Sequence, residues 1–65
     1  MEKYCLVGVD GNAFAIMAYV VNAMHECGKS ADEALAYQKA AMSGDYNNLL
    51  CESMKVINRL NELVQ

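Results

Sequence analysis

One stretch near the N-terminus constrains this chain more than any other feature. Eleven of the twelve residues from Ala13 to Met24 are apolar, and only Asn22 interrupts them. A helix that is apolar nearly all round belongs inside a structure. The whole chain has only 65 residues, which is close to the lower limit for a self-sufficient core. The stretch is therefore expected to carry more apolar surface than one copy of the chain covers by itself.

This apolar stretch is expected to form the first of three helices, over about residues 13–27. Asn12 or Asp10 can cap its start, and Gly28 stands where a helix commonly ends on a left-handed residue. The apolar positions at helical spacing are expected to face the core. They are a main stripe of Phe14, Met17, Val21 and Met24, flanked by Ile16, Val20 and Cys27.

Capping residues and apolar spacing predict two further helices. The second, over about residues 31–43, opens with a capping box, in which the side chains of Ser30 and Glu33 each accept a hydrogen bond from the other residue's backbone N–H. The third, over about residues 46–63, follows Asp45 as its N-cap. The buried positions are expected to be Ala31, Ala34, Leu35, Ala41 and Met42 on the second helix, and Leu49, Leu50, Ser53, Val56, Ile57, Leu60 and Val64 on the third.

The chain is thus expected to form one all-α domain, residues 1–65, a small three-helix bundle with a short extended or β N-terminal segment over about residues 3–9. Tyr4 to Val9 is β-prone, and the turn residues that follow break the run. A lone strand leaves its backbone N–H and C=O groups open. Either the segment pairs with another copy or with another protein's sheet edge, or it lies over the helices and bonds to water.

Charge and cysteine content bear on partners and compartment. Eight acidic residues face five scattered basic ones, for a net charge of −3, which disfavours nucleic-acid binding because no basic cluster can neutralise several phosphates. The longest apolar run, Ala13 to Val21, is shorter than the about 20 residues of a membrane span, so no membrane partner is expected. Three cysteines without paired spacing, and no signal peptide, favour reduced thiols in a cytoplasmic protein.

No motif predicts catalysis or a metal centre. His25 and Cys27 are two positions apart on a helix and do not face each other, and the remaining cysteines have no ligand spacing. The carboxylates are dispersed, with no pair suited to acid–base work. We therefore expect no enzyme activity, no catalytic residue, no metal ligand and no cofactor.

Two polar turns are the candidate contact or ligand sites. The turn Asp10-Gly11-Asn12 precedes a helix, where free N–H groups and the helix dipole can bind an anion, although these residues also serve simply as turn and cap. The loop Asp45-Tyr46-Asn47-Asn48 carries residue types found at interfaces, or is simply a capped connection between helices. The candidate residues are Asp10, Gly11, Asn12, Asp45, Tyr46, Asn47 and Asn48.

Two resemblances to known proteins accompany these patterns. Gly28-Lys29-Ser30, Ala34-Leu35 and Gly44-Asp45-Tyr46-Asn47 resemble the first loop, second helix and second loop of ubiquitin-associated domains. That family has an aromatic residue where lysine follows the first glycine here, so the resemblance implies a compact three-helix arrangement more than ubiquitin binding. Leu6 to Met17, with Ser43 to Leu50, resembles short uncharacterised proteins of bacteria and their mobile elements, which implies no activity.

These observations favour a small non-enzymatic interaction or regulatory protein. It is expected to act as a homo-oligomer or by binding a larger host or phage protein. One alternative is a small-ligand protein that binds an anion or nucleotide at the turn and helix start from Asp10 to Ala13. Another alternative is a purely structural assembly subunit.

Overall fold

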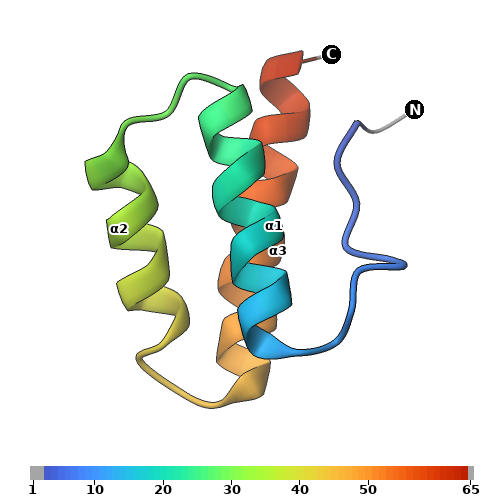
Figure 1. The fold of residues 1–65 in the computed structure, drawn as a ribbon, viewed down its shortest axis with the longest axis vertical. Coiled ribbons are helices and arrows are strands. Elements are labelled where there is room, and N and C mark those ends of the chain that lie inside the picture. Colours follow the sequence, from blue (N-terminus) through green and yellow to red (C-terminus); the bar gives the residue numbers. More distant parts are fainter. Residues whose placement is uncertain (1–2, 65) are drawn as a thin grey trace.

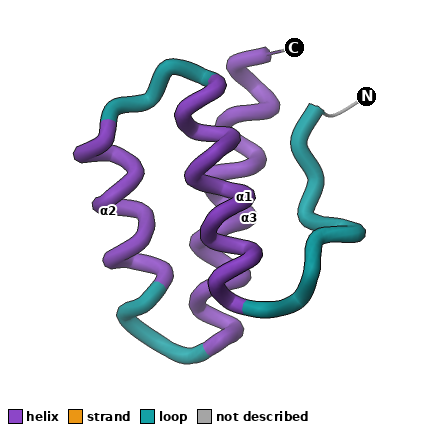
Figure 2. The backbone as a smooth tube through the Cα atoms, viewed as in Figure 1, coloured by secondary structure: helices purple, strands orange, loops and turns teal. Residues whose placement is uncertain are grey.

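The described part of the chain folds into three helices that follow an N-terminal segment. The computed structural model describes residues 3–64, in which α1 spans Ala13–Glu26, α2 spans Ala31–Ala41 and α3 spans Tyr46–Val64. α2 lies on one side of the neighbouring helices α1 and α3, and the N-terminal segment lies on the other side (Figures 1 and 2). The all-α prediction is confirmed, and residues 3–64 contain no strand. The predicted domain also includes residues 1, 2 and 65, which lie outside the described residues.

Local hydrogen bonds set where each helix begins. In each case a side-chain oxygen accepts a bond from a backbone N–H of the first turn, a contact that contributes about 1 kcal/mol. These bonds join Asn12 Oδ1 to Phe14 N at 2.8 Å, Ser30 Oγ to Glu33 N at 3.2 Å and Asp45 Oδ1 to Asn48 N at 3.0 Å. Glu33 completes the predicted capping box by accepting from the Ser30 N–H at 3.2 Å.

The core lies between the three helices, and each helix contributes one buried stripe. The buried helical positions are Ile16, Val20, Ala23 and Met24 on α1, Ala34, Tyr37 and Ala41 on α2, and Leu49, Ser53, Ile57, Leu60 and Asn61 on α3. The hydroxyls of Tyr37 and Ser53 share a buried hydrogen bond of 2.6 Å. Because each hydroxyl satisfies the other, both polar groups are accommodated in the core.

The predicted main stripe of α1 is wrong at its start. Phe14 is 73% exposed, whereas Ile16 and Val20, expected to flank the stripe, are buried. At about 100° per residue, Phe14 lies roughly opposite Ala23, which is also buried. α1 therefore has two apolar faces. α3 and α2 cover the face of Ile16, Val20 and Ala23, and no fourth helix is present among residues 3–64 to cover the other.

The predicted buried side of α2 is also partly wrong. Ala34 and Ala41 are buried as expected, but Leu35 and Met42 are exposed, and so is Ala31. Tyr37, which is not among the predicted buried positions, is buried in their place. The hydrogen bond to Ser53 gives the tyrosine hydroxyl a partner inside the core, so the helix is rotated to bury the aromatic ring.

Asn61 holds the N-terminal segment against α3. Its Oδ1 accepts from the Tyr4 N–H, and its Nδ2 donates to the Tyr4 carbonyl, both at 2.9 Å. The N–H of Cys5 donates to the Tyr19 hydroxyl at 3.0 Å. No strand therefore forms over residues 3–9 within the single chain, and pairing with another chain stays a prediction. At Tyr4 and Cys5 the polar groups that a neighbouring strand or water was expected to satisfy bond to side chains of α1 and α3.

The Tyr4 hydroxyl ties the same segment to the end of α1. It donates to Glu26 Oε1 at 2.9 Å and accepts from Cys27 Sγ at 3.6 Å. The Cys27 hydrogen bond, burial and the Glu26 carboxylate together raise the pKa of Tyr4 above its usual value near 10. Burial also raises the pKa of Tyr37, partly offset by the bond to Ser53.

We expect the free energy of unfolding to fall above about pH 10. Both tyrosine pKa values are raised in the folded chain, so the unfolded chain loses these protons first as the pH rises. The two tyrosines therefore contribute their full stabilisation below the pKa of tyrosine in the unfolded chain. This contribution is lost as the pH rises towards their pKa values in the folded chain. Urea denaturation from about pH 8 to about pH 11 measures this decline.

The variant Tyr37→Phe serves as the check on this pH dependence. It is expected to make the alkaline decline shallower, because one of the two perturbed groups is removed. At about pH 8 it is expected to lower the free energy of unfolding by about 1–3 kcal/mol, because Ser53 loses its buried partner. A wild-type urea midpoint that is as high at about pH 11 as at about pH 8 contradicts the expectation.

Candidate functional site

The two polar turns that the sequence singles out lie at the same end of the bundle. The Tyr46 hydroxyl, at the start of α3, donates a hydrogen bond to the Gly11 carbonyl, just before α1. Thirty-five positions separate these two residues in the sequence. The tertiary structure therefore joins the turn Asp10–Asn12 and the loop Asp45–Asn48 into one polar rim.

Much of the hydrogen-bonding capacity of this rim is used within the chain. Asp10 Oδ1 accepts from the Asn12 N–H at 2.9 Å, and Asn12 Oδ1 caps α1. Asn48 Nδ2 donates to the carbonyls of Ala40 and Ala41, at 2.8 and 3.3 Å, which satisfies the end of α2. Two of the N–H groups on which an anion site at this turn would draw therefore bond to side chains of the protein itself.

A glycine makes this packing of the loop against α3 possible. A Cβ atom at Gly44 would lie 2.9 Å from the Asn48 Cβ. Since real Cβ atoms do not approach each other so closely, only glycine fits here without displacing Asn48. The exposed Asn47 lies beside this contact, and all four residues from Asp45 to Asn48 are in the rim.

Beside the rim lies an exposed apolar surface that no other part of residues 3–64 covers. Phe14 is 73%, Met42 65% and Tyr46 46% exposed. They border two adjoining shallow hollows of about 290 and 370 Å³, which share Phe14, Met17 and Met42 and are otherwise lined by α1, α2 and the start of α3. We call this surface the Phe14 face and define it as Phe14, Met17, Val21, Met42 and Tyr46.

The charge that lines the two hollows of the Phe14 face is negative. Asp45 is the only charged side chain that lines either hollow, and no lysine or arginine of the described residues lines them. Asp10 is exposed beside Gly11, which Tyr46 contacts. The surface is therefore apolar at its centre and acidic at its rim.

Sequence reasoning found the polar rim but missed the apolar centre. The apolar pattern of α1 and α2 predicts Phe14 and Met42 in the core, although this pattern fits more than one face. The helical spacing of the sequence does contain a signal for the Phe14 face. Phe14, Met17 and Val21 share one side of α1, and Ile16, Val20 and Ala23 share another. Nothing in the sequence says which of these two sides meets the neighbouring helices.

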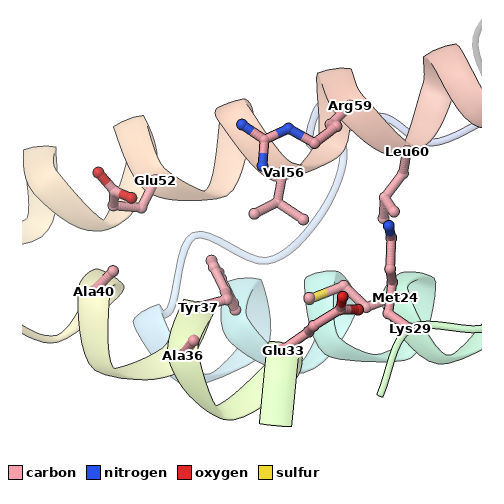
Figure 3. Close-up of a pocket in the computed structure, with 10 residues that line it drawn as sticks. All are labelled: Met24, Lys29, Glu33, Ala36, Tyr37, Ala40, Glu52, Val56, Arg59 and Leu60. Carbon is pink, nitrogen blue, oxygen red and sulfur yellow. The ribbon is translucent and has the colours of Figure 1, made fainter. Parts of the chain in front are cut away.

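A separate cleft of about 350 Å³ lies between α2 and α3. Its apolar lining consists of Met24, Tyr37, Val56 and Leu60. On α2 the cleft is open because the side chains of Ala36 and Ala40 are small. Four charged side chains border it: Lys29, Glu33, Glu52 and Arg59 (Figure 3). Sequence reasoning gave no sign of this cleft, because its residues come from three separate segments.

Other kinds of site find little support in the described residues. Within residues 3–64, no three His, Cys, Asp or Glu side chains gather as a metal site would require. Cys5, Cys27 and Cys51 are all free, and Cys5 and Cys51 are exposed. No helix between residues 3 and 64 is both long and apolar enough to cross a membrane. Comparison of the chain with models of protein families, with curated proteins and with solved structures finds no match.

Proposed function

We propose that this chain is a small non-enzymatic interaction protein that binds another protein through the Phe14 face. The observation that carries the proposal is the exposure of Phe14 beside Met42 and Tyr46. Aromatic and methionine side chains are enriched at the centres of protein interfaces. Methionines also adapt to differently shaped partners. A contiguous apolar surface of this kind, bordered by polar residues, is typical of a contact site.

The chemistry of this surface favours one class of partner, an amphipathic helix with basic residues beside its apolar stripe. Apolar side chains of such a helix fit shallow hollows between helices. Lysine or arginine flanking the stripe complements Asp10 and Asp45 at the rim. Two copies of this chain joined through the same face would instead bring four of these carboxylates together, which disfavours the homo-oligomer as the primary assembly. A larger protein is thus the favoured partner.

A reducing compartment such as the cytoplasm suits this proposal. Cys5 and Cys51 are exposed free thiols, and exposed thiols tend to form disulfides in oxidising compartments. A regulatory role also fits the proposed contact. Regulation by binding alone needs only a surface and a partner.

The proposal is tested with a designed peptide and the labelled protein. The peptide is an amphipathic helix of leucine and lysine, and its counterpart carries glutamate in place of each lysine. We expect the lysine peptide to shift the amide resonances around Phe14, Met17 and Met42. The variant Phe14→Ser is expected to weaken binding by at least about 30-fold, because aromatic anchors at interface centres dominate affinity.

The matched control is Leu35→Ser, which makes the same kind of change at an exposed apolar position that lines neither hollow. It is expected to leave peptide binding unchanged. Equal binding of the two peptides, or equal loss in both variants, contradicts the proposal. Sedimentation equilibrium of the protein alone is expected to give a monomer. A dimer that Phe14→Ser disrupts shows instead that a second copy occupies the face.

A further inference from the structure

We propose that the cleft between α2 and α3 binds a small aliphatic carboxylate, with its chain on the apolar lining and its carboxylate between Lys29 and Arg59. This site lies between α2 and α3, whereas the Phe14 face lies between α1, α2 and the start of α3, and the two share no residue. The inference is therefore independent of the proposed protein contact. The proposed protein contact involves none of the residues that line this cleft.

The size and lining of the cleft suit a small amphiphile. Its volume of about 350 Å³ falls within the range of about 300–1,000 Å³ that small-molecule sites occupy. The half-buried Val56 and the small side chains of Ala36 and Ala40 supply the accessible apolar surface. The nearly buried Met24, Tyr37 and Leu60 complete the lining (Figure 3). The Tyr37 hydroxyl is already paired with Ser53, so the lining presents the ring rather than a polar group. An aliphatic chain is the complementary part of the ligand.

The charges of the cleft differ in whether the chain itself satisfies them. Glu52 forms a salt bridge of 3.1 Å with Lys55, and Glu33 accepts the Ser30 N–H in the capping box. Lys29 and Arg59 form no salt bridge with any other described residue. Glu52 is thus paired with a cation of the chain, whereas Glu33 keeps its charge because its partner is a neutral N–H. The two cations without a salt bridge outnumber this one acid.

The two cations also come from opposite walls of the cleft. Lys29 belongs to the loop between α1 and α2, and Arg59 belongs to α3 (Figure 3). Glu52 lies seven positions before Arg59 on α3, about 10 Å along the helix axis. The carboxylate of a ligand at the Lys29 end is therefore distant from Glu52. Glu33 borders that end of the cleft (Figure 3), and the charges of Lys29 and Arg59 together exceed its single negative charge. Charge-assisted hydrogen bonds to lysine and arginine are the usual means of binding such a group.

The test uses octanoate as the probe, with octylamine and octanol as its cationic and neutral counterparts. Octanoate titrated into the isotope-labelled full chain is expected to give saturable amide shifts at Ala36, Ala40 and Val56, and none at Phe14. Octylamine and octanol are expected to bind at least about tenfold more weakly, since neither carries a negative charge to pair with the two cations. Equal binding of all three, shifts confined to the Phe14 face, or no saturable shift overturns the proposal.

Variants separate the two parts of the site. The double variant Lys29→Gln with Arg59→Gln is expected to weaken octanoate binding by at least about tenfold. Ala36→Leu, which keeps a strong helix former at an exposed position, is expected to abolish binding by filling the cleft. Lys3→Gln and Lys39→Gln remove the same charge at exposed positions that do not line the cleft and serve as the control pair. Retained binding in the double variant, with circular dichroism unchanged, also overturns the proposal.

Discussion

Replacing Asn61 with alanine is expected to lower the free energy of unfolding by about 2–4 kcal/mol and to release the N-terminal segment from α3. The Asn61 side chain is nearly fully buried and bonds both backbone polar groups of Tyr4. Its loss leaves a buried N–H and a buried C=O without partners, unless the segment moves out to water. If it moves, Tyr4 loses its burial and its bonds to Glu26 and Cys27.

Hydrogen exchange at the Tyr4 amide, together with urea denaturation, measures both parts of this expectation. The matched control is Asn58→Ala, the same substitution at an exposed position of the same helix, which is expected to change stability by less than about 0.5 kcal/mol. If Tyr4 exchanges as slowly in Asn61→Ala as in the wild type, then Asn61 does not hold the segment.

The second large effect is expected from Leu60→Ala. Leu60 is among the largest fully buried side chains of the described residues, and truncating a buried leucine costs about 2–5 kcal/mol through lost burial and the cavity that remains. A domain of this size has a net stability of only about 3–5 kcal/mol. The variant is therefore expected to be substantially unfolded at room temperature, with a large loss of helical circular dichroism.

Leu63→Ala provides the comparison for this core substitution. Leu63 is 58% exposed on the same helix, three positions away, so the same change removes little buried surface. Its urea midpoint is expected to stay close to that of the wild type. Equal midpoints for the two alanine variants would show that Leu60 does not occupy the core.

The start of each helix could be predicted because its signals are local. Asn12, Ser30 and Asp45 each bond an N–H within three residues, so neighbouring residues alone contain the information. The buried stripe of α3 was also predictable at Leu49, Ser53 and Leu60, since polar residues occupy the opposite side and leave one apolar face. The same reasoning identified the turns that now form the polar rim.

The apolar centre of the candidate site was not predictable in this way. α1 is apolar on two faces, so its pattern is equally consistent with burying Phe14 or Ile16. The choice depends on where α2 and α3 pack. Similarly, Tyr37 is buried because Ser53, sixteen positions later, gives its hydroxyl a partner. Neither result follows from a pattern within one helix.

The sequence by itself determined that this chain is helical and where its helices start. It also determined that the first helix has more apolar surface than the rest of the chain covers. Only the tertiary structure decided which part of that surface stays exposed, that Asn61 rather than a second strand satisfies Tyr4, and that Gly11 meets Tyr46. The physical reason is the distance along the sequence over which each interaction acts. Caps and helical periodicity act within about one turn of helix, whereas packing and long-range hydrogen bonds depend on residues that only folding brings together.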